Sequence, residues 1–204
     1  MNYITYVLFS FIIGSIPFAL IITKILFEKD VRDYADKNPG ATNAFRAAGA
    51  KAGVPSLLFE IGKGYIVVYV AQLYDFPLLL IMIGAFSAIL GHAYSVFLKF
   101  KGGKSIAVSM GALFGIYGII MPIFFAIGAF IGIIIYKKDV HSTVVGIWSM
   151  PIGAIILHYA FINILFLGSL AVFLTYRQIR TTPLDMDIIK SGIEAYKSFR
   201  SSNR

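Results

Sequence analysis

The chain alternates long uncharged, apolar runs with short clusters of polar and charged residues. An α-helix needs roughly 20 apolar residues to cross a bilayer, and most of the runs approach or exceed that length. The pattern predicts seven membrane-spanning helices over residues 3–23, 53–73, 78–97, 105–118, 121–136, 143–157 and 159–176. We therefore expect an all-α, polytopic integral membrane protein in which residues 1–204 form a single domain.

Two of the uncharged runs are too long for one ordinary crossing. Gly118 and Pro122 interrupt the first, which extends over residues 105–136. His158 marks a division of the second, which extends over residues 143–176. Glycine and proline are the strongest local breaks in a helical pattern. Each run is therefore interpreted as a pair of short helices.

Lysine and arginine residues fall on one side of this seven-span arrangement. With the N-terminus outside, the inward segments 24–51, 99–104, 137–138 and 177–204 contain 6, 3, 2 and 6 of them, or 17 of the 18. The remaining one, Lys63, lies within a span. The positive-inside rule therefore predicts an outside N-terminus and a cytoplasmic C-terminus.

The C-terminal tail has its own periodic pattern. Apolar side chains recur at helical spacing at Ile188, Ile189, Ile193, Tyr196 and Phe199, and Lys190, Lys197 and Arg200 fall largely between them. Such a pattern is typical of an amphipathic helix that lies in the membrane interface. We expect this helix on the cytoplasmic leaflet, where it would either recruit lipid or anchor the last span.

Composition agrees with the membrane assignment and excludes several kinds of site. The chain is 58% hydrophobic and 14% charged, against about 25% charged residues in soluble domains. It has no cysteine, which removes disulfides, thiolate nucleophiles and Cys-ligated metals. Its three histidines have no metal-ligand spacing, so we expect no metal. The net charge of +8 is interpreted as topology or contact with anionic lipid, before nucleic acid.

The first polar cluster at the predicted inner face is "KNPGATNAFR", residues 37–46. Asn38 opens an Asn-Pro-Gly turn signature, and Thr42, Asn43 and Arg46 follow at one-turn spacing. This arrangement could bind a substrate. Alternatively, it is an ordinary loop in which Thr42 or Asn43 caps the next helix.

Three ionisable residues lie inside or at the end of predicted spans. Glu60 and Lys63 are three residues apart and share one face of the second span. Charges at membrane depth are expensive, so such residues normally face the bundle interior or a water-filled cavity. The pair could hold helices together or support a site. His92, near the end of the third span, is either a hydrogen-bonded interfacial residue or part of that site.

The stretch "KFKGGKSIAV", residues 99–108, leads directly into a predicted helix. Gly102 and Gly103 allow a tight turn that presents backbone N–H groups, and a helix N-terminus adds further donors. Lys101 and Lys104 add positive charge. The stretch is thus either a phosphate-binding loop or a flexible basic loop between spans.

Four motifs follow one another in the first half of the chain: "GSIPFALII", "NPGATNAFRAAG", "LFEIGKG" and "GHAYSVFLKFKGGKSIAV". In order and spacing they resemble the bacterial acyl-phosphate:glycerol-3-phosphate acyltransferase family, PlsY. The resemblance implies a seven-span enzyme of the bacterial cytoplasmic membrane with its site facing the cytoplasm. Its members transfer a fatty acyl group from acyl phosphate to the 1-hydroxyl of glycerol 3-phosphate, without a cofactor. The product, lysophosphatidate, enters phospholipid synthesis.

The resemblance also implies roles for particular residues. Those that would orient the acceptor or the reacting carbonyl are Asn43, His92 and Ser142. Those that would bind the substrate phosphates are Thr42, Arg46, Lys101, Gly102, Gly103 and Lys104. Supporting roles fall to Asn38, Glu60 and Lys63. The expected partners are acyl phosphate, glycerol 3-phosphate and membrane lipid; the oligomeric state stays open.

Three segments depart from the family pattern. The glycine loop ends with Lys104-Ser105 where a glycine normally follows the lysine. Residues 33–38 read "DYADKN" where the family has Ser-Gly-Ser-Gly-Asn. After the last span the chain reads "LTYRQIRTTPLD" in place of a signature that contains histidine and asparagine, although Arg177 or Arg180 could supply positive charge. These departures motivate an alternative: a divergent relative that binds or transports a phosphorylated lipid, or that acylates a different acceptor.

Overall fold

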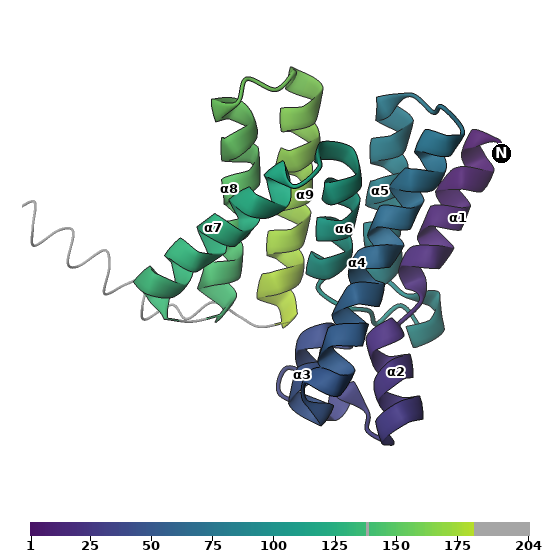
Figure 1. The fold of residues 1–204 in the computed structure, drawn as a ribbon, viewed down its shortest axis with the longest axis vertical. Coiled ribbons are helices and arrows are strands. Elements are labelled where there is room, and N and C mark those ends of the chain that lie inside the picture. The colour runs from purple at the N-terminus through teal and green to yellow at the C-terminus, as the bar shows by residue number, and fades with distance from the viewer. Residues whose placement is uncertain (138, 182–204) are drawn as a thin grey trace, which may run out of the picture.

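The computed structural model describes residues 1–137 and 139–181, and these residues are helical apart from short connections (Figure 1). The expected all-α class is confirmed for this part of the chain, whereas the C-terminal amphipathic helix lies outside it. Two 3₁₀ turns cover Val31–Asp33 and Val96–Leu98. The α-helices are α1 (Tyr3–Ser15), α2 (Phe18–Phe27), α3 (Ala41–Ala48), α4 (Ala50–Leu73), α5 (Leu78–Ala93), α6 (Ile106–Tyr117), α7 (Ile120–Tyr136), α8 (Asp139–Ile156) and α9 (Phe161–Thr181).

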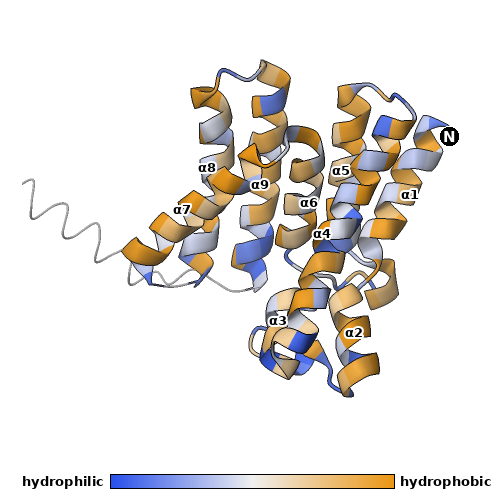
Figure 2. Cartoon of the chain, viewed as in Figure 1, coloured by the Kyte–Doolittle hydropathy of each residue, from blue (hydrophilic) through white to orange (hydrophobic). Residues whose placement is uncertain are grey.

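The helices form one bundle with a smaller helical region at one end (Figure 1). Helix α1 packs on α5 and α4 packs on α6, while α7, α8 and α9 pack in sequence beside them. Helices α2 and α3 lie below the bundle in this view and contact the first part of α4. Hydrophilic residues gather at this same end, over α3 and the lower end of α9 (Figure 2).

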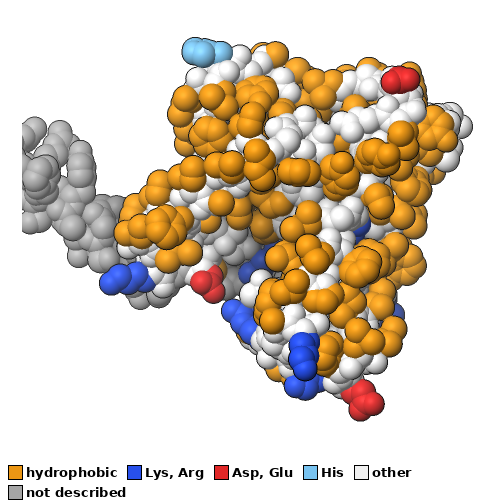
Figure 3. All heavy atoms as spheres, viewed as in Figure 1, with side chains coloured by type: hydrophobic (Ala, Val, Ile, Leu, Met, Phe, Trp, Pro, Cys, Tyr) orange, Lys and Arg blue, Asp and Glu red, His pale blue; other side chains and the backbone are white. Residues whose placement is uncertain are grey.

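Five stretches of the described chain are long and apolar enough to cross a membrane: Tyr3–Phe27, Ala50–Leu73, Leu78–Leu98, Asp139–Ile156 and Phe161–Thr181. Helices α6 and α7 are shorter but apolar. Large apolar side chains cover the outside of the bundle (Figure 3). An all-round apolar exterior is typical of helices that lie in lipid. The chain is a membrane protein.

The two long uncharged runs are each divided into two helices. Gly118, at φ 63°, ends α6, and this left-handed conformation favours glycine. Pro122 lies in the first turn of α7, where its missing N–H leaves no helical hydrogen bond unmade. His158, at φ 55°, lies in the connection between α8 and α9. Local backbone chemistry thus accounts for both divisions.

The first apolar run differs from the single continuous helix expected over residues 3–23. Ile16 is extended, at φ −62° and ψ 119°, and Pro17 precedes the first residue of α2. Proline disfavours the helical conformation in the residue before it and donates no backbone hydrogen bond, so α1 ends there. The break leaves backbone groups that other residues must satisfy within the membrane.

Helix α3 corrects a second expectation. The residue that caps it is Gly40, with no side-chain hydrogen bond, so the alternative in which Thr42 or Asn43 caps this helix is wrong. Both residues lie inside α3. Their side chains are therefore available for contacts other than capping.

Glycines allow two pairs of helices to approach very closely. A Cβ on Gly14 of α1 would overlap the Ala88 carbonyl oxygen of α5. A Cβ on Gly64 of α4 would likewise overlap the Val108 carbonyl oxygen of α6. Small residues at such contacts let backbones pack directly, which is how helices associate when both are surrounded by lipid. Two close helix pairs therefore form, α1 with α5 and α4 with α6.

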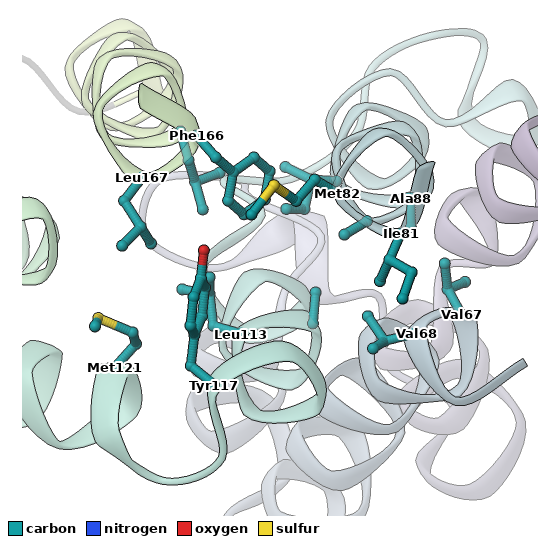
Figure 4. Packing of buried hydrophobic residues seen from close by; sticks show 14 of the residues in the cluster. Val67, Val68, Ile81, Met82, Ala88, Leu113, Tyr117, Met121, Phe166 and Leu167 are labelled. Carbon is teal, nitrogen blue, oxygen red and sulfur yellow. The ribbon is translucent and has the colours of Figure 1, made fainter. Parts of the chain in front are cut away.

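Helix α6 joins these pairs to the remaining helices (Figure 4). Leu113 and Tyr117 of α6 lie beside Leu167 of α9 and Met121 of α7, and all four are buried. The Tyr117 hydroxyl donates a 3.1 Å hydrogen bond to Asn163 Oδ1 of α9. One continuous apolar core therefore connects α1, α4 and α5 to α8 and α9.

Candidate active site

A buried ion pair satisfies the break between α1 and α2. Glu60 Oε2 and Lys63 Nζ of α4 are 2.6 Å apart, and both side chains are almost fully buried. Lys63 Nζ also donates to the Ile16 carbonyl at 2.8 Å, and Glu60 Oε1 accepts from the Ala19 N–H at 3.4 Å. The lysine thus satisfies a carbonyl group at the C-terminal end of α1, and the glutamate satisfies an N–H group at the N-terminal end of α2. Each charge lies at the helix end whose partial charge is opposite to its own.

His92 extends this pair towards the glycine loop. Its Nδ1 lies 3.0 Å from Glu60 Oε2 and 2.9 Å from Lys63 Nζ. The opposite edge of the ring faces the loop, because a Cβ on Gly103 would overlap His92 Nε2. His92 is buried, and its ring packs against the loop at Gly103. It does not line the pocket described below.

The glycine loop uses its central amides internally, which corrects the expectation that they are presented to a phosphate. The Gly102 N–H donates to the Ala93 carbonyl at 3.1 Å, and the Gly103 N–H donates to the His92 carbonyl at 3.0 Å. A Cβ on Gly102 would overlap the His92 carbonyl oxygen. The glycines are thus required for close packing against the end of α5.

Arg177 of α9 binds the other side of the loop. Its guanidinium donates to the Gly102 carbonyl at 3.0 Å and to the Gly103 carbonyl at 3.2 and 2.8 Å. It also lies over the Tyr94 ring, 5.0 Å from the centroid, in a cation–π contact. This buried arginine has a structural role: it fixes the loop to the C-terminal part of α9.

The loop directs Lys104 inwards and leaves Lys101 exposed. Lys104 Nζ lies 2.8 Å from Asp36 Oδ2, and the lysine side chain is 16% exposed. Burial raises the pKa of the Asp36 carboxyl, but the hydrogen bond and the charge of Lys104 outweigh burial and hold that pKa below its ordinary value. Asp36 is therefore ionised at neutral pH.

Asn43 of α3 organises the segment before it. Its Nδ2 donates to the Tyr34 carbonyl at 2.9 Å, to Asp36 Oδ1 at 3.0 Å and to the Asn38 carbonyl at 3.0 Å. Its Oδ1 accepts from Arg46 at 2.9 Å. Both polar atoms of this buried side chain are thus engaged within the protein. Asn43 positions Asp36 and Arg46 and does not line the pocket.

A pocket of about 820 Å³ lies between α3, α6, α7, α8 and α9, next to the residues described above. Figure 3 shows the hollow between the lower helical region and the arm formed by α7, with basic and acidic side chains at its edge. One wall is apolar and consists of Ile106, Phe125, Ala129 and Ile133. The polar lining consists of Asp36, Asn38, Thr42, Arg46, Lys104, Asp139, Ser142, Thr143, Gln178 and Thr181.

The pocket contains five of the residues that the sequence singled out: Asn38, Thr42, Arg46, Lys104 and Ser142. It does not include Asn43, Glu60, Lys63, His92, Lys101, Gly102 or Gly103. Of this second group, Asn43 hydrogen-bonds to the lining residues Asp36 and Arg46. Gly102 and Gly103 precede Lys104 in the loop, and Glu60 and Lys63 are connected to this loop through His92. Lys101 is exposed at the surface of the loop.

Sequence reasoning missed Gln178 and Thr181, which lie in the last turns of α9. Gln178 is 3% exposed, and its Oε1 has no hydrogen-bond partner among the described residues. Asn38 Oδ1 is also buried and has no hydrogen-bond partner among the described residues. A buried oxygen without a donor is costly, so both atoms point to a ligand that donates hydrogen bonds. The predicted end of the last span, at residue 176, had left Gln178 outside the helix.

The fold defines an integral membrane protein with a pocket that combines charged side chains and an apolar wall. A family model described as "Glycerol-3-phosphate acyltransferase" matches residues 4–182. The chain therefore belongs to the glycerol-3-phosphate acyltransferase family, and the resemblance seen in its motifs is confirmed.

Individual relatives agree with this assignment. A glycerol-3-phosphate acyltransferase of Staphylococcus carnosus is 38% identical over 173 residues, which cover 78% of this chain and 82% of the relative. One from Pelagibacter ubique is 38% identical over 156 residues, with 76% and 80% covered. One from Staphylococcus aureus is 35% identical over 193 residues, with 87% and 92% covered.

Two crystal structures of PlsY (YgiH), an integral membrane glycerol 3-phosphate acyltransferase, have the same fold. The glycerol 3-phosphate form superposes with a TM-score of 0.79 at 24% identity, and the lysophosphatidic acid form with 0.76 at 26%. In both cases the match covers 93% of this chain and 92% of the other. The helical arrangement described above is thus the family fold.

Proposed function

We propose that this chain transfers a fatty acyl group from acyl phosphate to the 1-hydroxyl of glycerol 3-phosphate, and that the pocket is where the transfer occurs. Acyl transfer to glycerol 3-phosphate follows from family membership. The composition of the pocket supports the choice of donor and the place of the reaction. Arg46 and Lys104 line the pocket together with an apolar wall of α6 and α7. Phosphate groups and an acyl chain match these two parts.

The proposed reaction requires no covalent bond to the protein. The hydroxyl oxygen attacks the carbonyl carbon of the acyl phosphate, a new C–O ester bond forms, and the C–O bond to phosphate breaks. Phosphate leaves with the bonding electron pair, and one of its oxygens accepts the hydroxyl proton. Acyl phosphate is an activated mixed anhydride, so positioning and electrostatic stabilisation account for most of the rate enhancement.

The pocket residues divide the binding work by charge and hydrogen-bonding capacity. Lys104 and Arg46 bind substrate phosphate oxygens, since charge-assisted hydrogen bonds are the strong ones. The Ser142 hydroxyl donates to the same oxygens or to the reacting carbonyl. The buried oxygens of Gln178 and Asn38 accept hydrogen bonds from the hydroxyl groups of the glycerol. The acceptor is thereby held by both its ends.

Two residues that the resemblance assigns to orientation would act through others. Asn43 holds Arg46 and Asp36 by direct hydrogen bonds. His92 packs against Gly103, next to Lys104. We therefore propose positioning roles for Asn43 and His92, which set the places of the two cations.

The acyl chain would lie along the wall formed by α6 and α7. Phe125, Ala129 and Ile133 recur at one-turn spacing on α7 and line the pocket. Ile133 lines the pocket and is 53% exposed. We propose that this wall is open to the lipid, so that a water-soluble acceptor and a membrane-dissolved donor meet in one pocket.

We also propose seven spans, with the N-terminus outside and the pocket and C-terminus facing the cytoplasm of a bacterium. Five long and two shorter apolar helices support this number. Lys and Arg side chains gather at the end where α2, α3 and the pocket lie (Figure 3), as the positive-inside rule requires of the cytoplasmic end.

This topology can be tested with single cysteines, because the chain has none of its own. In intact cells, a membrane-impermeant maleimide is expected to label an Asp75→Cys variant and to leave a Lys51→Cys variant unlabelled until the membrane is opened. The reverse pattern would invert the proposed orientation. Equal labelling of both in intact cells would contradict the span count.

The activity is tested by supplying purified protein with glycerol 3-phosphate and either acyl phosphate or acyl coenzyme A, and by measuring lysophosphatidate. We expect product with acyl phosphate alone as donor. Glycerol and other phosphorylated polyols serve as competing acceptors, and we expect glycerol 3-phosphate to be preferred. Preference for another phosphorylated polyol would instead support the alternative acceptor considered from the sequence.

A further inference from the structure

Asp36 places a carboxylate inside the end of the pocket that binds phosphate. Its Oδ2 lies 2.8 Å from Lys104 Nζ, at charge-assisted hydrogen-bond distance. Its Oδ1 accepts from Asn43 Nδ2 at 3.0 Å, and Asn43 in turn accepts from Arg46. The carboxylate is therefore connected directly to one pocket cation and through a single side chain to the other.

The pocket lining is balanced in charge as a result. Its described charged residues are two cations, Arg46 and Lys104, and two carboxylates, Asp36 and Asp139. Asp139 is 92% exposed and 3.9 Å from Arg46, so water and salt screen it. Asp36 is 19% exposed and acts at close range. Of the two carboxylates, Asp36 is the one that offsets the cationic charge offered to a substrate.

We propose that Asp36 is a specificity-determining residue that competes with phosphate for Lys104. It holds the ammonium in place while the site is empty and weakens the binding of any phosphate that takes its position. The inference rests on the proposed function, in which inorganic phosphate is a product that must leave before the next acyl phosphate binds. A built-in carboxylate favours that release and disfavours small anions that lack the hydroxyl and acyl contacts.

Two other roles for Asp36 fit the structure less well. As a proton acceptor for the attacking hydroxyl it would be weak, because Lys104 keeps the pKa of this carboxyl low. As a purely structural tie between the residue 34–38 segment and the glycine loop, it would stabilise the pocket. Its removal would then weaken phosphate binding. The competing role predicts the opposite sign.

The experiment compares purified wild-type protein with Asp36→Asn and Asp36→Ala variants. Calorimetric titration with inorganic phosphate and with glycerol 3-phosphate gives the dissociation constants, independently of turnover. We expect both variants to bind phosphate about tenfold more tightly, which corresponds to about 1.4 kcal/mol. In turnover assays, we expect KM for glycerol 3-phosphate to fall and inhibition by inorganic phosphate to strengthen in parallel.

Asp33→Asn is the matched control, since it removes the same charge from the same segment at an exposed position outside the pocket. We expect its phosphate affinity to equal that of wild type. The Asp36 variants should also show a steeper loss of phosphate affinity with added salt, because the pocket becomes net positive. Thermal unfolding in detergent identifies any variant that is not folded. If Asp36→Asn is not folded, Asp36→Ala carries the test, and if Asp36→Ala is not folded, Asp36→Ser takes its place.

Unchanged or weaker phosphate binding in both folded variants would overturn the inference. Tighter binding in Asp36→Asn alone would also overturn it, because the new amide donor would then explain the gain. These results are distinct from a failure of the proposed function. In that case the wild-type protein itself would make no lysophosphatidate from acyl phosphate, whatever the phosphate affinities are.

Discussion

Replacing Lys104 by alanine is expected to lower kcat/KM for glycerol 3-phosphate by about 100-fold or more, equivalent to about 2.7 kcal/mol of transition-state stabilisation. The substitution removes the charge-assisted donor that we propose for the substrate phosphate. It also leaves the Asp36 carboxylate in the pocket without the ammonium that now lies 2.8 Å away. The pocket then repels the anions it should bind. Initial rates of lysophosphatidate formation over a range of glycerol 3-phosphate concentrations measure the effect.

A second substitution separates these two contributions. In the Lys104→Ala background, Asp36→Asn should recover roughly a tenth of wild-type activity or less, and the two effects should not be additive because the residues are in contact. Lys51→Ala, at an exposed lysine at the start of α4, removes the same charge away from the pocket and should leave the rate unchanged. Full activity in Lys104→Ala would remove Lys104 from the phosphate site.

Replacing Glu60 by alanine is expected to destabilise the protein by about 3–5 kcal/mol, the range measured when one partner of a buried ion pair is removed. The Lys63 ammonium would stay buried, 2.9 Å from His92 Nδ1, without its carboxylate. The Ala19 N–H at the start of α2 would lose its acceptor as well. The loss of stability is measured by heating the protein in detergent and determining, by gel filtration, the fraction that stays monodisperse at each temperature.

The matched comparison removes both charges together. A Glu60→Gln, Lys63→Met double variant should unfold at a higher temperature than Glu60→Ala, because no uncompensated charge remains in the bundle. Glu28→Gln, at an exposed position after α2, should unfold like wild type. A Glu60→Ala protein as stable as wild type would show that the pair does not maintain the break between α1 and α2.

Local signals in the sequence predicted much of the helical arrangement. Gly118 and His158 mark real breaks because a left-handed backbone conformation is a property of one or two residues. The break at Pro17 was missed even though proline was visible there, because an uncharged run alone indicates a span and not whether the helix is continuous. The extension of α9 to Thr181 was missed because polar residues after an apolar run resemble a loop.

Residues of the candidate site could be predicted only where a sequence motif marked them and their position in the fold also brought them to the pocket. Lys104, Arg46 and Ser142 were identified from their motifs and all line the pocket. Gln178 could not be found, because its place in the pocket depends on how α9 packs against the glycine loop through Arg177. The predicted role of the loop amides failed for a similar reason. Their acceptors, the carbonyls at the end of α5, are set by the packing of the folded chain.

The apolar wall of the pocket has a consequence for how this enzyme should be measured and inhibited. Ile133 belongs to the pocket lining and is 53% exposed, and under the proposed function a chain-bearing molecule reaches the site from the bilayer. Its effective concentration is then its mole fraction in lipid and not its amount per volume of water. Apparent constants for acyl substrates will scale with the quantity of lipid or detergent in the assay. Inhibitors that partition into membranes will be correspondingly favoured over water-soluble ones of equal intrinsic affinity.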